Sequence, residues 1–461
     1  MSDQEEISEG INNPTVVAKY KEAGEIADSV LIQIASECVE GAKVLELCKK
    51  GDKLILEKTN AIHTDDDKML KGISFPTCIS INECAGHFSP LSDSKTVLKK
   101  GDLIKIDLGV HIDGYSALVA NTLVVGEKII TGKKAKVIEA TQKAAAEIIK
   151  LLKPKQKSGE IATVLQKTTD EYQCQALESV YSHSMERFAD EGDKKIVMRD
   201  AMQSKKQKSN QKVQKSQEIE IEENEVYVID ILISTGTGKT TQADDRTTIF
   251  LRSPDASYQL RMKASRQLFN LIKKKYPTYP FTIRDLDETK AKFGVKECVS
   301  HELLVPFPVT SEKNGELIAH YKFTVLILPE ETIKITNLKD LDYKLEIKKE
   351  TEKETEKETE KEKETEKETE KEKETEKENQ SQDDKEKEKE KEKEQPKKVE
   401  QKPKPQIKKK KPKRKGKKKG KKKNQKKQPQ KQTKQQQPKK ESQSQSQSQN
   451  QSQSQSQSQN N

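Results

Sequence analysis

The chain has 461 residues and a formal net charge of +11, with 31% hydrophobic and 4% aromatic residues. Globular domains are usually about 45–50% apolar, so this average excludes one compact domain that extends over the whole chain. The positive charge is concentrated at one end. Residues 348–461 contain 38 basic and 24 acidic residues, whereas the preceding residues contain 50 and 53. The composition therefore predicts a nearly neutral folded body followed by a polar, basic extension.

The cysteines and the hydropathy pattern narrow the cellular setting. Six cysteines are scattered without a C-x-x-C pair, which favours a reducing compartment over a disulfide scaffold or a zinc knuckle. The acidic start, MSDQEEISEG, is unlike a signal peptide. No apolar run approaches the roughly 20 residues that span a membrane. We therefore expect a cytoplasmic or nuclear protein without membrane insertion.

The first predicted elements are helices. Residues 1–14 form an acidic leader that we expect to be disordered. From residue 15, apolar side chains recur at helical spacing, and Gly41 is expected to stop this helix. Residues 44–56 indicate a second helix. Residues 73–90 mix apolar and turn residues, which predicts a strand with a loop.

A predicted hairpin and a third helix follow. Residues 102–112 and 117–125 read as strands on either side of an Asp-Gly turn at Gly114. Residues 131–152 are rich in Ala and Ile and predict a helix.

The later part of the body again mixes strands and a helix. Residues 226–234 predict a strand, with 247–252 as its expected partner. Residues 258–276 predict an amphipathic helix, and residues 321–328 a late strand. This mixture of helices and antiparallel hairpins indicates an α+β fold.

Two segments of the body echo each other. Both GDLIKIDLGVHIDG (101–114) and NEVYVIDILISTGTG (224–238) pass from a turn through an apolar strand with Ile-Asp to a Gly-bearing turn. Two such halves facing each other would bring Asp107 and Asp230 to the centre. Chance similarity of two hairpins is the alternative.

The C-terminal extension has three zones with different compositions. We expect a folded domain over 15–346, a charged Lys-Glu-Thr-Glu repeat over 347–400, a basic segment over 401–440 and a Ser/Gln tail over 441–461. None of the three zones can bury apolar surface, so none should fold alone.

One glycine-rich stretch resembles a phosphate loop only in part. STGTGKTT (234–241) lacks the glycine that such a loop needs five residues before Gly238, because Ile233 stands there. We therefore interpret it as a hairpin turn and reject nucleotide binding.

Two of the six histidines have small neighbours that leave room around the ring. His87 stands in NECAGHFSP and His183 in YSHS. With Asp107 and Asp230 they would make a His/carboxylate centre of the kind that metal ions use. Taken singly, each histidine is more often a surface or core residue.

At these residues the chain resembles a known family. FPTCISINECAGHFSP, GDLIKIDLGVHIDG, VYSHS, NEVYVIDILISTGTGK and AHYKFTVLILP are similar, in order and spacing, to segments of type 2 methionine aminopeptidases. They are closer still to the non-catalytic proliferation-associated, growth-factor-receptor-binding relatives of that enzyme. The resemblance covers roughly residues 15–345. It implies the pita-bread fold with a type 2 helical insertion, here at about residues 253–310.

The resemblance also implies which residues occupy the metal-ligand positions of the enzymes. Asp107 and His183 are retained, and Asp230 replaces a glutamate. Leu118 and Lys322 stand at the remaining two positions, and neither can supply a ligand in its usual state. His87 matches the histidine that assists catalysis, whereas the position of a second substrate-side histidine falls near Glu191.

These replacements predict a pseudo-peptidase without a complete dimetal site and without a cofactor. A bimetallic peptidase needs bridging carboxylates that hold two ions about 3.5–4 Å apart. We expect Lys322 to form an ion pair with Asp107, Asp230 or both, and His87 to be vestigial. A single metal ion held by Asp107, His183 and Asp230 is the alternative.

Basic residues in the body and the extension are candidate RNA contacts, because Lys and Arg neutralise backbone phosphates. The loop 203–217 is also basic. The candidates in the body are Arg252, Arg261, Lys263, Arg266, Lys273, Lys274 and Lys275. Those in the extension are Lys408, Lys409, Lys410, Lys411, Lys413, Arg414 and Lys415. Simple solvation of the surface is the alternative for each set.

The resemblance implies a binding protein that acts in translation, ribosome biogenesis or growth regulation. Its expected partners are ribosomal RNA in the large ribosomal subunit, other RNA and nuclear proteins. We expect a monomer in the cytoplasm, nucleus and nucleolus. Two alternatives are an active metal-dependent methionine aminopeptidase and a module that binds histones or transcription factors.

Overall fold

The computed structural model describes residues 10–178, 180–199, 218–337, 341 and 343–347. All of them lie within the unit formed by residues 1–370. The loop 203–217, the basic candidates from Lys408 to Lys415, the leader up to residue 9 and the three zones of the extension from residue 348 lie outside the described residues.

A nine-stranded sheet forms the centre of the described part. Its main path runs β1-β3-β4-β15-β9-β7-β8, with β16 beside β15 and β6 beside β9. Pairing between these strands is antiparallel throughout. The strands are β1 Lys71–Ile81, β3 Leu103–Ile112, β4 Tyr115–Val124, β6 Gln175–Ala176, β7 Tyr181–Ser184, β8 Lys195–Val197, β9 Glu225–Ser234, β15 Ile318–Ile327 and β16 Thr332–Lys334.

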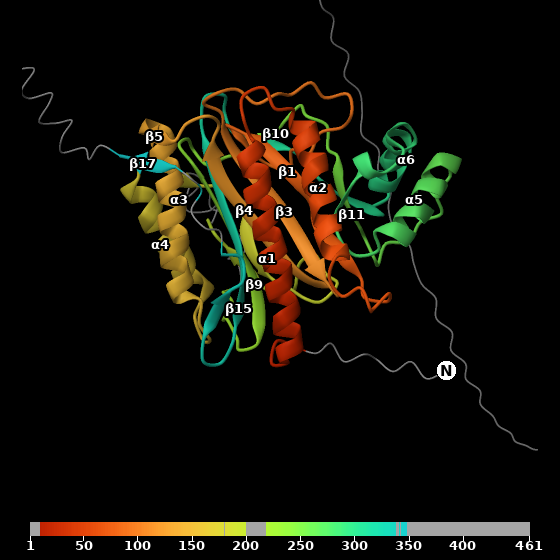
Figure 1. Ribbon diagram of the computed structural model, residues 1–461, viewed down its shortest axis with the longest axis horizontal. Coiled ribbons are helices and arrows are strands. Elements are labelled where there is room, and N and C mark those ends of the chain that lie inside the picture. The colour runs from red at the N-terminus through yellow and green to blue at the C-terminus, as the bar shows by residue number, and fades with distance from the viewer. Residues whose placement is uncertain (1–9, 179, 200–217, 338–340, 342, 348–461) are drawn as a thin grey trace, which may run out of the picture. The chain divides into compact units, whose positions relative to one another are not determined.

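Two pairs of helices cover this sheet, one pair over each half. Helices α1 (Pro14–Glu37) and α2 (Val44–Asn60) pack on β4, β3 and β1 (Figure 1). Helix α3 (Gly132–Leu151) packs on β15 and β9. Helix α4 (Ser158–Glu171) packs on β6 and β8. Alternate residues of each strand face these helices, because side chains along a strand point to opposite faces.

The two halves have separate apolar cores. One includes Ile104, Ile106 and Leu108 of β3 together with α1 and α2. The other includes Ile229 and Ile231 of β9 together with α3 and α4. The intervening residues, including Asp107 and Asp230, therefore face away from the helices.

A third, smaller core lies beside the main sheet. Helices α5 (Lys263–Lys275) and α6 (Glu288–Ser300) pack together against a three-stranded sheet (Figure 1). That sheet consists of β11 Ile249–Arg252, β12 Phe281–Thr282 and β13 Leu304–Phe307, and η2 Ile283–Asp285 follows β12.

Several predicted elements are confirmed, and the fold is α+β as expected. Helices α1, α2 and α3 and strands β1, β3, β4, β9 and β15 match the predicted segments to within a few residues. Helix α1 ends at Glu37, before the positive-φ Gly41 (φ 83°). No helix among the described residues is long and apolar enough to cross a membrane.

Two predictions in the later body are wrong. Strand β11 pairs with β12 and β13, whereas β9 pairs with β15, β7 and β6. The amphipathic helix begins at Lys263, not at residue 258, because the Glu297 carboxylate accepts the backbone N–H groups of Arg261 and Met262 outside the helix.

Short strands complete the described structure. Strand β10 (Thr241–Gln242) pairs with β14 (Thr310–Ser311), which pairs with β2 (Cys84–Gly86). Strand β5 (Ile129–Thr131) pairs in parallel with β17 (Lys344–Glu346).

Candidate functional site

The strand register brings the two candidate aspartates into one row. Asp107 of β3 lies opposite Ala120 of β4, Ala120 lies opposite Lys322 of β15, and Lys322 lies opposite Asp230 of β9. Residues directly opposite each other share one face of an antiparallel sheet. Because the small Ala120 separates Lys322 from Asp107, the long lysine side chain extends across β4 to reach the aspartate.

Lys322 forms a buried ion pair with both aspartates. Its Nζ lies 2.9 Å from Asp107 Oδ2 and 3.4 Å from Asp230 Oδ2. The side chains of Lys322 and Asp107 are only 8% and 6% exposed. The second oxygen of Asp230, Oδ1, lies 2.6 Å from Nε2 of His320. We call these four residues, Asp107, Asp230, His320 and Lys322, the ion-pair centre.

His320 was not predicted as a site residue. It stands two residues before Lys322 on the same strand, so both side chains point to the same face of the sheet. Once Lys322 is recognised as a site residue, this spacing is the signal that could have identified His320.

The charges within the ion-pair centre reinforce one another. Burial favours the neutral form of Asp230, but Lys322 and then His320 outweigh burial and hold the pKa of Asp230 well below its usual range. Burial likewise favours neutral Lys322, but Asp107 and Asp230 outweigh it and raise the pKa of Lys322 above its usual value. Lys322 is therefore an ammonium ion, which has no lone pair with which to bind a metal.

His87 lies beside the ion-pair centre, and among the described residues its hydrogen bond is made elsewhere. Its ring packs against Phe75 and Phe307, and the Lys322 ammonium lies 5.5 Å from the centroid of the Phe75 ring. Nδ1 of His87 lies 3.1 Å from the carbonyl oxygen of Pro308, so Nδ1–H donates to it. Burial lowers the pKa of His87, which keeps the imidazole neutral.

His183 and Leu118 lie on the same face of the sheet as the ion-pair centre. His183 lies on β7 opposite Val228, and its Nδ1 is 3.0 Å from the carbonyl oxygen of Ser184. Burial lowers the pKa of His183. Leu118 lies on β4 two residues before Ala120, so it faces the same side of the sheet as Asp107 and Lys322 and packs there among apolar side chains. Glu191 pairs with Lys195 at 2.5 Å.

Among the described residues, no group of three or more His, Cys, Asp or Glu side chains is arranged to hold a metal ion. The four candidates Asp107, His183, Asp230 and His87 surround the Lys322 ammonium without forming such a group. The residues present in and around the centre are thus a lysine, two carboxylates and imidazoles.

The glycine-rich turn after β9 binds a carboxylate of the same chain. Glu312 accepts hydrogen bonds from the N–H groups of Thr237 and Gly238 and from the hydroxyl groups of Ser234 and Thr237. A side chain at Gly236 would meet the Glu312 and Glu316 carboxylates. The N–H groups that could bind a phosphate therefore already have an anionic partner.

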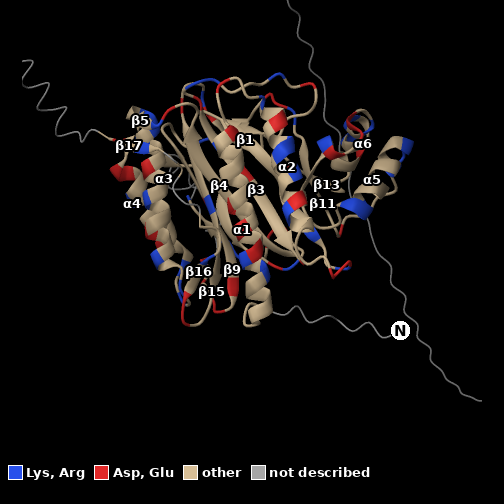
Figure 2. Cartoon of the chain, viewed as in Figure 1, with Lys and Arg blue, Asp and Glu red and all other residues tan. Residues whose placement is uncertain are grey.

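The predicted basic residues of the body lie in and around helix α5 (Figure 2): five are in the helix, Arg261 precedes it and Arg252 ends β11. The segment 256–284 contains no Asp or Glu, and among the described residues none of these cations forms an ion pair within 4 Å. The exposed members are Arg261, Lys263, Arg266, Lys273, Lys274 and Lys275, whereas Arg252 is half-buried and bonds to the Pro277 carbonyl.

The neighbouring α6 exposes an aromatic side chain. Phe293 is 70% exposed, the highest value among the exposed large hydrophobic residues described. Lys290 and Lys296, three residues away on either side, are also exposed. Positive charge and an exposed ring on adjacent helices make a surface suited to phosphates and unpaired bases.

Comparison with known proteins first defines the class of fold. The family model of metallopeptidase family M24 matches residues 18–240. A solved structure described as a thermophilic Arx1 superimposes with a TM-score of 0.65 at 29% identity, covering 72% of this chain and 94% of that chain. The described residues therefore have the M24, or pita-bread, fold, as the resemblance predicted.

Curated relatives then identify the particular family. The ERBB-3 binding protein 1 of Solanum tuberosum is 44% identical over 341 residues, covering 73% of this chain and 86% of that protein. The proliferation-associated protein A of Dictyostelium discoideum is 39% identical, covering 71% and 83%. The chain belongs to this ERBB-3 binding, proliferation-associated protein family. The curved DNA-binding protein of Schizosaccharomyces pombe is 34% identical, covering 73% and 88%.

Proposed function

We propose that this protein is a catalytically inactive member of the M24 fold that binds RNA of the large ribosomal subunit. The observation that carries the first half is the position of Lys322 Nζ, 2.9 Å and 3.4 Å from the two aspartates. The ammonium neutralises the carboxylates that would otherwise attract a cation.

The side chains at the ion-pair centre are also poorly suited to bind two metal ions. Two ions need bridging carboxylates. Here one Asp107 oxygen and one Asp230 oxygen bind Lys322, and the other Asp230 oxygen binds His320. Leu118, at the position where the enzymes carry a further aspartate, is packed among apolar side chains. A metal ion would have to displace the ammonium from its buried pair.

The second half of the proposal rests on the unpaired cations of α5 and on the lysine-rich segment. Their charge would attract phosphates without reading base sequence, and the binding should weaken steeply with salt. That a relative is named a curved DNA-binding protein supports contact with nucleic acid in this family. Phe293 on α6 would add base stacking, which favours RNA with unpaired bases over duplex DNA.

The proposal includes the domain limits and the cellular setting. We propose a folded domain over 15–346 with its insertion at about 253–310, followed by the charged repeat 347–400, the basic segment 401–440 and the tail 441–461. A monomeric ribosome-binding protein of this kind would act in translation, ribosome biogenesis or growth regulation, in the cytoplasm and the nucleolus.

Sedimentation of the tagged protein through a sucrose gradient tests this function. The full chain should migrate with the large ribosomal subunit at low salt and leave it at high salt, and a variant without residues 401–440 should leave at lower salt. Absence from the ribosomal fractions at low salt would refute the proposal. Retention of histones in place of ribosomal subunits would support the alternative module.

A further inference from the structure

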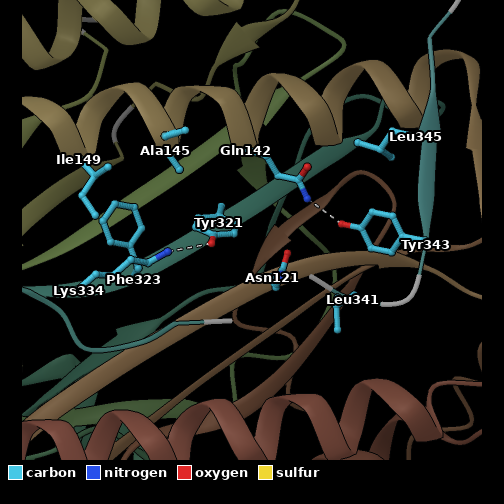
Figure 3. Close-up of a pocket in the computed structure, with 11 residues that line it drawn as sticks. Asn121, Gln142, Ala145, Ile149, Tyr321, Phe323, Lys334, Leu341, Tyr343 and Leu345 are labelled. Atoms are coloured by element: carbon cyan, nitrogen blue, oxygen red, sulfur yellow. Dashed lines mark hydrogen bonds between the residues drawn. The ribbon is translucent and has the colours of Figure 1, made fainter. Parts of the chain in front are cut away.

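A cavity of about 390 Å³ lies on the helix side of the main sheet, away from the ion-pair centre (Figure 3). Tyr321 and Phe323 of β15 line it, whereas Lys322 between them points to the opposite face. Helix α3 covers it with Ala145 and Ile149. Its volume falls within the range of about 300–1,000 Å³ that is usual for small-molecule sites.

A single lysine supplies the charge in this cavity. Nζ of Lys334 donates to the Tyr321 hydroxyl at 3.0 Å and lies 5.0 Å and 4.8 Å from the ring centroids of Tyr321 and Phe323 (Figure 3). Among the described residues no carboxylate lies within 4 Å of this ammonium, and no acidic residue lines the cavity. Within the described part of the chain, the Lys334 ammonium is therefore held by aromatic groups, and its charge also acts on the more distant Asp28 carboxyl.

A buried amide adds a second donor. Asn121 on β4 is 5% exposed, and its Oδ1 accepts the backbone N–H of Thr122 at 2.7 Å. Its NH2 group is not among the fully buried side-chain groups that lack a partner in the described part of the chain, so it is accessible from the cavity. The nearby Gln142 amide is already used, because its Nε2 donates to the Tyr343 hydroxyl at 2.9 Å. The accessible Asn121 amide can donate a hydrogen bond to an acceptor placed in the cavity.

We propose that this cavity binds a small organic anion: a carboxylate on an apolar body. The carboxylate would accept hydrogen bonds from Lys334 and Asn121, and the apolar body would pack on Ile149 and Ala145 beneath α3. A cation is disfavoured as the ligand, because the wall residues that the structure describes include one ammonium and no acidic side chain. The proposal does not depend on RNA binding or on the state of the ion-pair centre.

Isothermal titration calorimetry of the full chain with 3-phenylpropionate and with octanoate tests the proposal. At least one of the two anions should bind, and which of them binds better distinguishes an aromatic from an aliphatic body. The neutral amide of the same compound should bind at least about tenfold more weakly, because charge-assisted hydrogen bonds are the strong ones.

Two variants and one control locate the site. Lys334→Met removes the ammonium and keeps the apolar stem, and it should weaken binding about tenfold or more. Ala146→Phe, at an exposed position of α3 on the cavity wall, should block entry without disturbing the fold. Lys143→Met, on the same helix but paired with Glu171, should bind as the wild type does. The proposal is overturned if neither anion binds the wild type, if the amide binds equally well, or if both variants bind unchanged.

Discussion

Replacing Lys322 by Met removes the charge of the ion-pair centre and keeps most of the side-chain volume. The variant leaves Asp107, with a side chain 6% exposed, facing Asp230 without a cation between them. Removing one partner of a buried ion pair costs about 3–5 kcal/mol. At about 2–4 °C per kcal/mol, the melting temperature should fall by about 6–20 °C.

Thermal unfolding followed by circular dichroism or calorimetry measures this effect. The matched control is Lys150→Met, which breaks an exposed pair with Glu147 and should change stability by no more than about 1 kcal/mol. Adding Asp107→Asn and Asp230→Asn to Lys322→Met should recover much of the loss, because no uncompensated charge then remains. A single variant that melts as the control does would refute the buried pair.

The difference in stability between the wild type and Lys322→Met should depend on pH, because the pKa values of Asp230 and Lys322 are shifted in the folded protein. The pKa of Asp230 is lower in the folded protein than the value of about 3.9 that it has in the unfolded chain. Its ionisation therefore stabilises the fold above about pH 3.9, and this stabilisation is lost as the pH falls through the folded pKa. The raised pKa of Lys322 gives stability that is present below about 10.4 and is lost as the pH rises through its folded pKa. The contribution of the ion pair to the stability of the wild type should therefore be constant between about pH 5 and pH 10, and the gap to Lys322→Met should shrink outside that window. A gap that does not shrink as the pH falls below about 4 would contradict this reasoning.

Three further predictions concern other parts of the molecule. Burial raises the pKa of the Asp28 carboxyl to about 7, so the folded protein loses stability as the pH rises from about 4 through 7 and this group ionises. The variant Asp28→Asn should therefore have a higher melting temperature than the wild type at pH 8 and the same melting temperature at pH 4. Glu312→Ala leaves the N–H groups of Thr237 and Gly238 without their acceptor, so the free energy of unfolding measured in urea should fall by about 2–4 kcal/mol. An unchanged urea midpoint would show that Glu312 does not stabilise this turn. Changing the three consecutive lysines 273–275 of α5 to Gln should flatten the dependence of log K for single-stranded RNA on log salt by about 2, in a fluorescence anisotropy titration. The matched control changes three exposed lysines of α2 (Lys49, Lys50 and Lys53) to Gln; an equal effect of both sets would show that α5 is not a specific surface.

The long elements of the fold could be predicted because their apolar periodicity is strong and local. Helices α1 and α3 and strands β3, β9 and β15 all have such patterns. The partner of β11 could not be predicted, because a four-residue strand carries little register information and its pairing depends on the small core around α5 and α6. The first residue of α5 could not be predicted either, because the segment before the helix is bound by the carboxylate of Glu297, which is distant in the sequence.

The candidate site could be predicted in part. The echo between the segments around Asp107 and Asp230 indicated that both aspartates meet, and the resemblance placed Lys322 beside them. The alignment of all three in one row depends on the pairing of β4 with β15, which are separated by about 200 residues and cannot be paired from sequence pattern alone. The same long-range pairing brings His320 to Asp230. Likewise, only the structure shows that Glu312 fills the glycine-rich turn.

The most direct test of the central claim, that a protein ammonium occupies the place of a catalytic metal centre, is release of methionine from the peptide Met-Ala-Ser by the purified full chain. The assay is run with Co²⁺ or Mn²⁺ and repeated with His87→Ala. We predict no turnover above background with either metal, and no difference between wild type and variant. Clear turnover by the wild type that His87→Ala abolishes would contradict the account.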